Sequence, residues 1–535
     1  MLRDNKIWIG NNEKGEPVSI VPKMANRHGL VAGATGTGKT VTLKVLAETF
    51  SDMGVPVFMA DVKGDIAGMM NPGADSEDMQ ARITKFGLAE QGFAYQGYPV
   101  NLWDIYGQKG IQLRTTISEM GPMLLSRILD LNELQSDILT IIFKIADDNG
   151  LLLIDTKDLK AMLNYVDEHG AEFQADYGKI SSASIGVIMR ALIALETNGG
   201  DIFFGEPALN ITDWMAQENG KGVINILDSS SLINSGKLYS TFLLWLLSEL
   251  FEMMPEVGDL DRPKMIFFFD EAHLLFNDAP KALLEKIEQV VKLIRSKGVG
   301  VYFCTQNPRD IPDGVLAQLS NKIEHGLRAY TPADQKAVRA AADSFRENSE
   351  FDTYETILNL GTGEAVVSFL GEDGIPGIAE KVYILPPQSF MGGVSDAERD
   401  VKAKSSILYS KYAVSVDPDS AFEVLQRKGV EDQAAAEAAA AQAAADKEAA
   451  KAAEKAEKEA AKEAEKAETA AAKAAEKAER ERQKEIKKVG NAVMGTVGRE
   501  VGKNIGKNFG SFGKTLGGNF GATLGRGILN TLIKK

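Results

Sequence analysis

Residues 33–40 have the types and spacing of a phosphate-binding loop. In order they are Gly33, Ala34, Thr35, Gly36, Thr37, Gly38, Lys39 and Thr40. They follow an apolar run and precede a helical pattern over residues 41–50. Glycines let the backbone curl so that successive N–H groups and a helix N-terminus face phosphate oxygens. We therefore expect this loop to bind ATP, with Lys39 on the β- and γ-phosphates and the Thr40 hydroxyl on Mg²⁺.

Two acids, Asp270 and Glu271, follow the apolar run 265–269. This arrangement predicts a Walker B element, in which Asp270 holds Mg²⁺ through water and Glu271 acts as the general base on the attacking water. Acids are also favoured at helix N-caps, so a buried strand that leads into a helix is the alternative interpretation. His273 has no assigned role.

A second polar strand end follows the run 299–304, where Thr305 and Gln306 occur. An amide both donates and accepts hydrogen bonds, so Gln306 is suited to sense the γ-phosphate or to orient water. A polar strand terminus without a role is the alternative. Asp61, at the end of the run 55–60, could face the nucleotide or simply cap a turn, and the sequence leaves both open.

Arg295 ends the amphipathic pattern 281–294, directly before this strand. We predict that it is an arginine finger that enters the site of a neighbouring subunit. Arginine is also favoured at helix C-termini by the helix dipole, which is a purely structural explanation. Arg309 and Arg328 are rival candidates for the finger.

These motifs require a fold that brings strand ends together. Short apolar runs alternate with helical patterns, which is typical of an α/β fold with a mainly parallel sheet covered by helices on both faces. Ligands in such folds lie beyond the carboxyl ends of the strands. We predict a RecA-like P-loop NTPase core whose strands are residues 29–32, 55–60, 222–227, 265–269 and 299–304, with a late pair at 364–370 and 381–385.

The composition divides the chain into six predicted segments. They are the first part of the ATPase core with the P-loop (1–112), a helical insertion (113–214), the second part of the core (215–390), a connecting segment (391–430), an Ala/Glu/Lys-rich helix (431–488) and a Gly-rich basic tail (489–535).

The two C-terminal segments have unusual compositions. Residues 434–488 favour a solvent-exposed single helix supported by Glu and Lys at i, i+4, with an Ala-rich coil as the alternative. In the tail, glycines and apolar residues recur in steps of four and three, a pattern suited to close helix contact. Seven Lys or Arg against one Glu give it a charge of 7 − 1 = +6, which suits an anionic membrane surface or an assembly zipper. A disordered Gly-rich tail is the alternative.

The overall composition restricts the class of protein. The chain has 535 residues, a net charge of −15, four histidines and one cysteine, Cys304, which we expect to be a small buried apolar residue. Disulfides and a zinc site are not expected. No apolar run is long enough for a signal peptide or a membrane span. We expect a cytoplasmic protein, with peripheral attachment to the inner membrane through the tail as a variant.

The motifs together resemble the HerA/FtsK superfamily of ring-forming ATPases, and within it the HerA-like branch. The resemblance rests on residues 26–40, then Phe-Phe-Phe-Asp-Glu at 267–271, Arg-Ser-Lys-Gly at 295–298 and Thr-Gln-Asn-Pro at 305–308, and it covers about residues 5–390. With its Ala/Lys-rich tail, the full chain is similar to YjgR-type bacterial proteins. The family's glutamine is often followed by an Arg-Pro-like pair, where this chain has Asn307, Pro308 and Arg309.

The resemblance implies a homo-hexamer that binds ATP and Mg²⁺ between subunits and moves double-stranded DNA through a central pore. The resemblance implies that the family's functional residues correspond here to Lys39, Thr40, Asp270, Glu271 and Gln306. It implies the same for Arg295, through its position before the strand. The alternatives are an ATPase that acts on a protein or membrane-surface partner through residues 431–535, and a nucleotide-dependent scaffold without enzymatic action.

Overall fold

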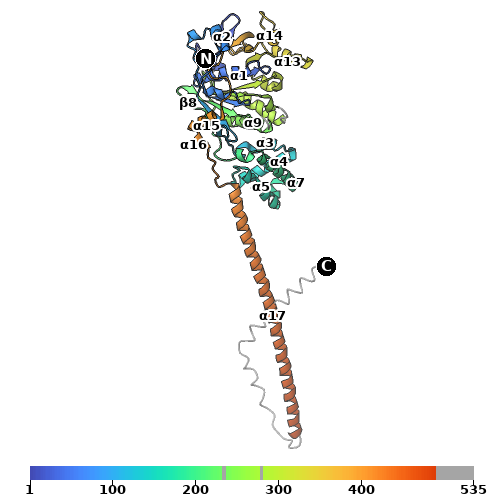
Figure 1. The fold of residues 1–535 in the computed structure, drawn as a ribbon. Coiled ribbons are helices and arrows are strands. Elements are labelled where there is room, and N and C mark those ends of the chain that lie inside the picture. Colours follow the sequence, from blue (N-terminus) through green and yellow to red (C-terminus); the bar gives the residue numbers. More distant parts are fainter. Residues whose placement is uncertain (232–235, 277–280, 490–535) are drawn as a thin grey trace. The chain divides into compact units, whose positions relative to one another are not determined.

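The computed structural model describes residues 1–231, 236–276 and 281–489 (Figure 1). By internal contacts the chain divides into two compact units, Met1–Asp432 and Gln433–Lys535. The predicted glycine and apolar stripes of the tail, which run from residue 497 to 525, lie outside the described residues.

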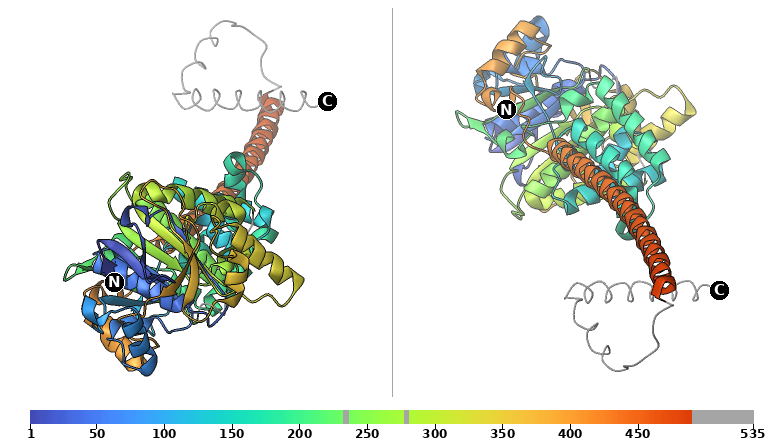
Figure 2. Two further views of the ribbon diagram at one scale, coloured as in Figure 1. Left: turned by 90° about the horizontal axis from the view of Figure 1, so that it is seen from above. Right: turned by 90° about the horizontal axis from the view of Figure 1, so that it is seen from below.

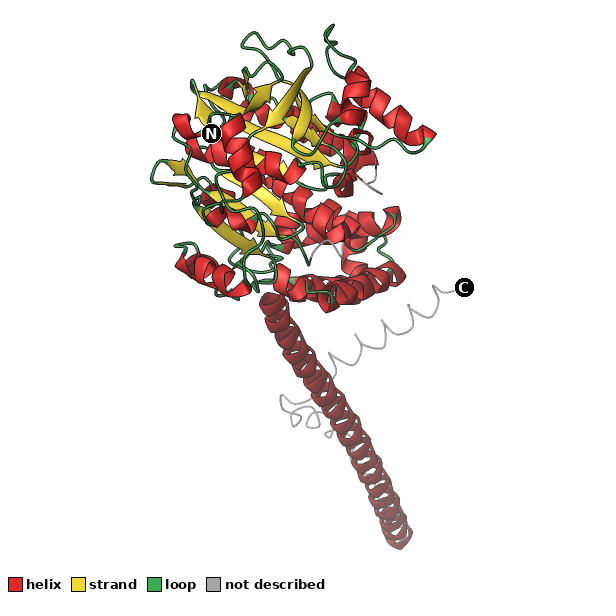
Figure 3. Cartoon of the chain, turned by 45° about the horizontal axis from the view of Figure 1, so that its top comes forward, coloured by secondary structure: helices red, strands yellow, loops and turns green. Residues whose placement is uncertain are grey.

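One large mixed sheet forms the centre of the first unit, with helices on both of its faces (Figure 3). Thirteen described strands belong to it, and β3 (Pro17–Ile20) pairs only with β2. Across the sheet the order is β1 (Leu2–Arg3), β2 (Lys6–Asn12), β15 (Glu380–Ile384), β14 (Glu364–Ser368), β13 (Asn321–His325), β4 (Gly29–Ala32), β12 (Val299–Thr305), β11 (Met265–Phe269), β5 (Val57–Asp61), β10 (Ile224–Asp228), β6 (Val100–Asp104) and β7 (Ile111–Gln112). A separate hairpin pairs β8 (Gln217–Glu218) with β9 (Lys221–Gly222).

The strands from β13 through β4 to β7 are all parallel, so their carboxyl ends meet along one edge of the sheet. The predicted strands 29–32 and 265–269 match β4 and β11. The other predicted runs differ from β5, β10, β12, β14 and β15 by one or two residues at their ends. The mainly parallel core predicted from the sequence is confirmed.

Alternate side chains of these strands enter two separate hydrophobic cores. In β11, Ile266 and Phe268 pack with Leu46 of helix α1 (Lys39–Asp52). Phe267 and Phe269 pack on the other face, which is covered by α9 (Gly236–Met253) and α11 (Lys281–Ile294). Strands buried on both faces consist of continuous apolar runs rather than alternating ones. This explains why the central strands could be identified from the sequence.

The described part of the chain contains seventeen α-helices. They are α1 (Lys39–Asp52), α2 (Glu77–Lys85), α3 (Ile117–Ile128), α4 (Glu133–Asp148), α5 (Thr156–Glu168), α6 (Gly170–Tyr177), α7 (Ser182–Thr197), α8 (Gly200–Phe203), α9 (Gly236–Met253), α10 (His273–Phe276), α11 (Lys281–Ile294), α12 (Asp313–Leu316), α13 (Pro332–Asp343), α14 (Thr353–Asn359), α15 (Asp396–Ser405), α16 (Tyr409–Tyr412) and α17 (Ala421–Val489). The segment predicted as a helical insertion contains α3 to α8, and α3, α4, α5 and α7 gather at one end of the first unit (Figure 1).

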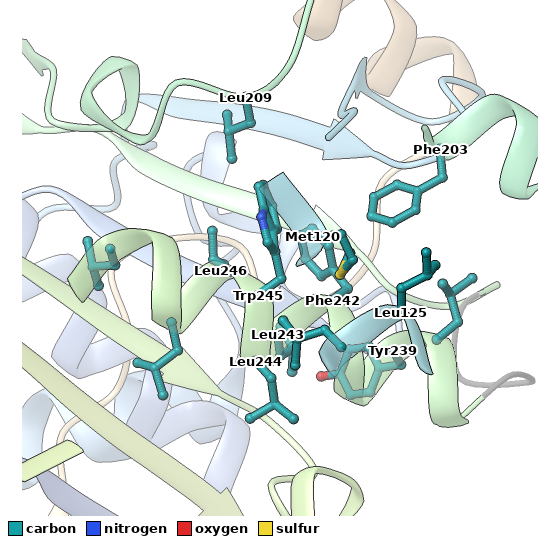
Figure 4. Packing of buried hydrophobic residues seen from close by; sticks show 14 of the residues in the cluster. Met120, Leu125, Phe203, Leu209, Tyr239, Phe242, Leu243, Leu244, Trp245 and Leu246 are labelled. Atoms are coloured by element: carbon teal, nitrogen blue, oxygen red, sulfur yellow. The ribbon is translucent and has the colours of Figure 1, made fainter. Parts of the chain in front are cut away.

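The insertion packs against α9 through large apolar side chains. Figure 4 shows Met120 and Leu125 of α3 beside Phe242 and Trp245 of α9, all of which are buried. The same helix carries Tyr239, whose hydroxyl donates to the backbone oxygen of Asp270 at 3.0 Å. The insertion is therefore connected through α9 to the strand end where the predicted catalytic acids lie.

Six strands of the large sheet were not predicted from the sequence: β1, β2, β3, β6, β7 and β13. The N-terminal β1, β2 and β3 pair antiparallel with one another, and Figure 2 marks the N-terminus beside these dark-blue strands. β13 reads Asn-Lys-Ile-Glu-His, which has no apolar run although four of its five residues are buried.

Helix α17 is 69 residues long and begins at Ala421, ten residues before the predicted Ala/Glu/Lys-rich segment. Its start is capped because the backbone N–H of Phe422 and the hydroxyl of Ser420 both donate to Asp158 of α5, at 2.8 and 2.6 Å. Its side chains from residue 426 to 482 are exposed, and i, i+4 ion pairs such as Glu454 with Lys458 lie along it. A helix was predicted here in preference to a coil, and the structure has the helix.

Within the described residues, no single helix combines the length and apolarity that a bilayer crossing needs. The pair α6 and α7 satisfies that test only together, with a bend of 104° between them.

Candidate nucleotide site

The predicted phosphate-binding loop lies between the end of β4 and the start of α1, at the carboxyl edge of the sheet. Gly33, Gly36 and Gly38 have φ values of 148°, 80° and 116°, which are left-handed conformations that favour glycine. A Cβ on Gly33 would lie 2.5 Å from the Cβ of His325. All three positions therefore favour glycine by conformation, and Gly33 is also required by space.

The loop is held in place by β13 and the turn that precedes β14. The backbone N–H of Ala34 donates to the Gly326 oxygen at 2.9 Å, and the N–H of Gly363 donates to the Thr37 oxygen at 3.0 Å. His325 lies beneath, with Nδ1 2.8 Å from a backbone oxygen and Nε2 2.9 Å from the hydroxyl of Thr42 in α1. Burial lowers the pKa of His325 to about 4, so the ring is neutral.

Lys39 is almost fully buried and folds back over the loop. Its Nζ donates to the backbone oxygens of Gly33 at 2.6 Å and Ala34 at 3.1 Å. These two backbone oxygens accept hydrogen bonds from the ammonium, as phosphate oxygens would. The Lys39 side chain therefore already points into the loop. Next to the loop, Glu324 of β13 is fully buried, and its Oε1 has no hydrogen-bond partner.

Asp270 directly follows β11. In the sheet, β12 lies between β11 and β4, the strand that leads into the P-loop. Its side chain is 8% exposed, and its Oδ1 accepts the backbone N–H of Glu271 at 2.9 Å. Burial raises the pKa of the Asp270 carboxyl, and the neighbouring Glu271 charge acts in the same direction. A bound cation would reverse this effect, since it favours the ionised carboxylate.

The hydroxyl of Thr40 and the carboxylate of Asp270 are hard oxygen donors of the kind that Mg²⁺ prefers. No group of three His, Cys, Asp or Glu side chains suited to a metal occurs in the described part of the chain. A Mg²⁺ ion here would therefore rely on nucleotide phosphates and water for its remaining ligands.

Glu271 and Gln306, predicted as base and sensor, lie together. The Gln306 Nε2 donates to the two carboxylate oxygens of Glu271 at 3.4 and 3.3 Å. Glu271 has φ 49°, a left-handed conformation that is rare for a non-glycine residue. It is 7% exposed, while Gln306 is exposed. The neighbouring β11 and β12 place both side chains at the edge that carries the P-loop.

Two further side chains contact Glu271 and were not assigned a role from the sequence. Lys63, which follows β5, has its Nζ 3.9 Å from Oε1, and His273 has its Nδ1 3.3 Å from Oε2. Lys63 is far from Glu271 along the chain, and only the adjacency of β5 and β11 brings them together. The sequence indicates this contact only indirectly, because Lys63 and Glu271 each follow a strand that was predicted to belong to the parallel sheet.

Asp61 serves the loop after β5 rather than facing the nucleotide loop. Its two carboxylate oxygens accept the backbone N–H groups of residues 64, 65, 66 and 67 at 2.7 to 3.3 Å. Burial raises its pKa to about 6. Of the two interpretations that the sequence left open, the turn-capping one agrees with these bonds.

Arg295 lies apart from the other predicted residues. It opens the short helix η6 (Arg295–Lys297) at the amino end of β12, and its Nη2 lies 3.5 Å from Asp259. The P-loop is at the carboxyl edge of the same sheet, so Arg295 does not reach the site of its own chain. Arg309, in η7 (Pro308–Asp310), and Arg328, after β13, are both exposed and follow carboxyl strand ends.

Comparison with known proteins gives the family. Residues 6–518 match the family described as Helicase HerA-like C-terminal. The chain belongs to this HerA-like family. All the predicted site residues, from Gly33 to Gln306, lie within the match, and so does the whole of the α17 helix.

Individual relatives of this HerA-like chain are distant. It is similar to the DNA double-strand break repair helicase HerA of Sulfurisphaera tokodaii, with 24% identity over 364 residues, 65% of this chain and 64% of the relative. The protein of the same name from Sulfolobus acidocaldarius is 22% identical over 369 residues, 67% of this chain and 65% of the relative. The chain thus spans just under two thirds of the length of these relatives.

Among solved structures, the unbound monoclinic form of the bacterial conjugative coupling protein TrwBdeltaN70 is similar, with a TM-score of 0.49 and 16% identity. The likeness covers 74% of this chain and 92% of that one.

Proposed function

We propose that this HerA-like chain hydrolyses ATP with Mg²⁺ as a ring-shaped homo-oligomer, a hexamer, and uses the energy to move along double-stranded DNA. The observation that carries the proposal is the meeting of Glu271 and Gln306 at the strand edge that bears the P-loop. A carboxylate and an amide at this place can respectively activate and orient a water for attack on a γ-phosphate.

Each residue of the site has a distinct part in this reaction. Lys39 and the loop N–H groups bind the phosphates and neutralise charge that develops on them. Thr40 and Asp270 would hold Mg²⁺, which supplies further charge neutralisation between the β- and γ-phosphates. Glu271 takes a proton from water, and Gln306 reports the presence of the γ-phosphate. Arg295, from a neighbouring subunit, would complete the charge compensation.

Support for DNA as the substrate comes from the comparisons with known proteins. The family and the names of two similar relatives, DNA double-strand break repair helicases, point to it. A net charge of −15 requires that any DNA path be a local basic channel rather than a generally basic surface.

The alternative partner is a protein or a membrane surface. The exposed side chains of helix α17 and the basic composition of residues 489–535 favour this alternative, because basic residues are attracted to anionic surfaces. Attachment through residues 431–535 would give the ATPase a cytoplasmic position at the inner membrane.

The test is the rate of ATP hydrolysis by the purified chain with Mg²⁺, alone and with duplex DNA, single-stranded DNA or RNA, alongside the mass of the assembly. We expect duplex DNA to raise the rate, and Glu271→Gln to lower it by roughly 10²- to 10⁴-fold while MgATP binding is retained. An active chain that ignores every nucleic acid would contradict the DNA assignment. Deletion of residues 431–535 then separates the alternatives, because it should leave hydrolysis intact but abolish membrane or protein attachment.

A further inference from the structure

Lys63 is placed to control the predicted catalytic base. It follows β5, the strand adjacent to β11 in the sheet, and its Nζ lies 3.9 Å from Oε1 of Glu271. The two side chains differ in exposure, since Lys63 is 45% exposed and Glu271 only 8%. A partly exposed cation therefore caps a carboxylate that has little access to water.

The loop that carries Lys63 is braced rather than free. The carboxylate of Asp61 accepts the N–H groups of the residues from 64 to 67, and Arg399 of α15 donates from Nη2 to the Gly64 oxygen at 3.4 Å. The other arm of Arg399 pairs with the buried Asp228 at 2.9 Å. These contacts fix the backbone on both sides of Lys63, so its ammonium is presented to one region of the site.

Both oxygens of the Glu271 carboxylate have polar neighbours. Gln306 donates to both oxygens, Lys63 lies beside Oε1, and His273 lies beside Oε2. A general base needs a free lone pair directed at the water whose proton it takes. A carboxylate that accepts hydrogen bonds from an amide and lies beside a cation is in a resting arrangement, and the side chain must leave these partners before it can act.

We propose that Lys63 is a positioning residue that restrains Glu271 in this resting arrangement and so limits the basal rate of ATP hydrolysis. The inference rests on the proposed ATP hydrolysis and adds a way in which its rate is limited. Gln306 is released from Glu271 when the γ-phosphate attracts its amide, and Lys63 then remains as the contact that holds the base back. Binding of the transported substrate would be the event that draws the two apart.

The chain offers a matched control for this lysine. Lys109 lies at the same edge of the sheet, with its Nζ 3.9 Å from Asp228 and 36% exposure, but it does not contact Glu271. Lys63→Met and Lys109→Met therefore remove the same charge from similar surroundings. Lys63→Arg retains the charge and is the conservative variant.

The experiment is steady-state ATP hydrolysis by the full chain with Mg²⁺ and without nucleic acid. We expect Lys63→Met to raise kcat about two- to five-fold with little change in KM, as the loss of one partly exposed ion pair allows. Lys63→Arg should stay near the unmodified rate, and Lys109→Met should equal it. A fall in kcat, a change confined to KM, or the same rise in Lys109→Met would overturn the proposal.

A second measurement does not depend on activity. Thermal unfolding of the full chain without nucleotide, for Lys63→Met, Glu271→Gln and the double variant, should give shifts in Tm that are non-additive by about 1–2 °C. Additive shifts would refute the contact itself. An unmodified chain that hydrolyses no ATP would instead defeat the proposed function, and the non-additivity would still decide whether Lys63 restrains Glu271.

Discussion

Glu271 shows how a single residue carries both strain and chemistry. A left-handed backbone costs a non-glycine residue roughly 1 kcal/mol or more, and glycine would avoid that cost. The conformation is stabilised where Oδ1 of Asp270 accepts the Glu271 N–H and where Gln306 holds the side chain. The presence of glutamate at this position is consistent with a need for its carboxylate rather than with backbone preference.

Glu324 makes a prediction about pH and stability. Burial raises its pKa from 4.5 to about 8, against the opposing charge of Lys39. The folded chain thus holds the proton more tightly than the unfolded chain, so this contribution to stability is complete below pH 4.5 and is lost as pH rises towards 8. We expect Glu324→Gln to remove a decline of about 1.4 kcal/mol per pH unit within that range.

The measurement is the free energy of urea unfolding of both chains from pH 5 to 8.5. Glutamine has nearly the same shape but does not titrate, so it serves as its own steric control. Curves for the two chains that run parallel across this range would show that the Glu324 carboxyl does not carry the effect.

Some residues of the site could be identified from sequence and others could not. The P-loop residues lie between one strand and the helix that follows it, and Asp270 and Glu271 directly follow another strand. Local sequence is therefore enough to propose these residues. Lys63 and Glu324 become part of the site only through strand adjacency, which depends on the order of β5, β11, β4 and β13 in the sheet. Local pattern does not contain that order.

At the scale of elements, the same limit applies to strands. β4 and β11 are buried on both faces and apolar throughout, and they were predicted with correct ends. β13 is buried too, but Asn321 and His325 satisfy their polar groups by hydrogen bonds to the backbone and to Thr42. Tertiary partners therefore replace the hydrophobic signal on which strand prediction depends.

Helix α15 makes a prediction about how the connecting segment is attached. Arg399 and Asp228 are 5% and 3% exposed and their side chains are 2.9 Å apart, so removal of Arg399 leaves the buried carboxylate with the more distant, partly exposed Lys109 at 3.9 Å. We expect Arg399→Met to lower the free energy of unfolding by roughly 3 kcal/mol, the low end of the range for a broken buried pair, because Lys109 compensates part of the charge. Addition of Asp228→Asn should restore part of this loss, because the stranded carboxylate is then neutral.

Urea unfolding followed by circular dichroism gives the comparison. The control lies in the same helix, where Asp400 and Lys404 form an i, i+4 pair with both side chains 56% exposed. Lys404→Met should leave the unfolding midpoint unchanged, since exposed pairs contribute little. Equal effects of Arg399→Met and Lys404→Met would mean that the buried pair does not fasten α15 to β10.

For the whole molecule, the proposed role of Arg295 as an arginine finger would require a second chain. The P-loop and Glu271 lie at the carboxyl edge of the sheet, whereas Arg295 lies at the amino end of β12. A head-to-tail ring places opposite sides of neighbouring copies against each other, as heterologous interfaces do. Such a ring would bring Arg295 of one subunit towards the Lys39 of the next.

This arrangement predicts complementation between two inactive variants. Lys39→Ala lacks phosphate binding and Arg295→Ala lacks the finger, so each alone should hydrolyse ATP at a small fraction of the unmodified rate. When the two are mixed and reassembled in equal amounts, about a quarter of the interfaces pair an intact loop with an intact arginine. Activity should therefore return to about that fraction, measured on assemblies of confirmed mass. If Arg309→Ala or Arg328→Ala complements Lys39→Ala and Arg295→Ala does not, the finger is that arginine. No recovery with any of the three would mean that the site is completed within a single chain.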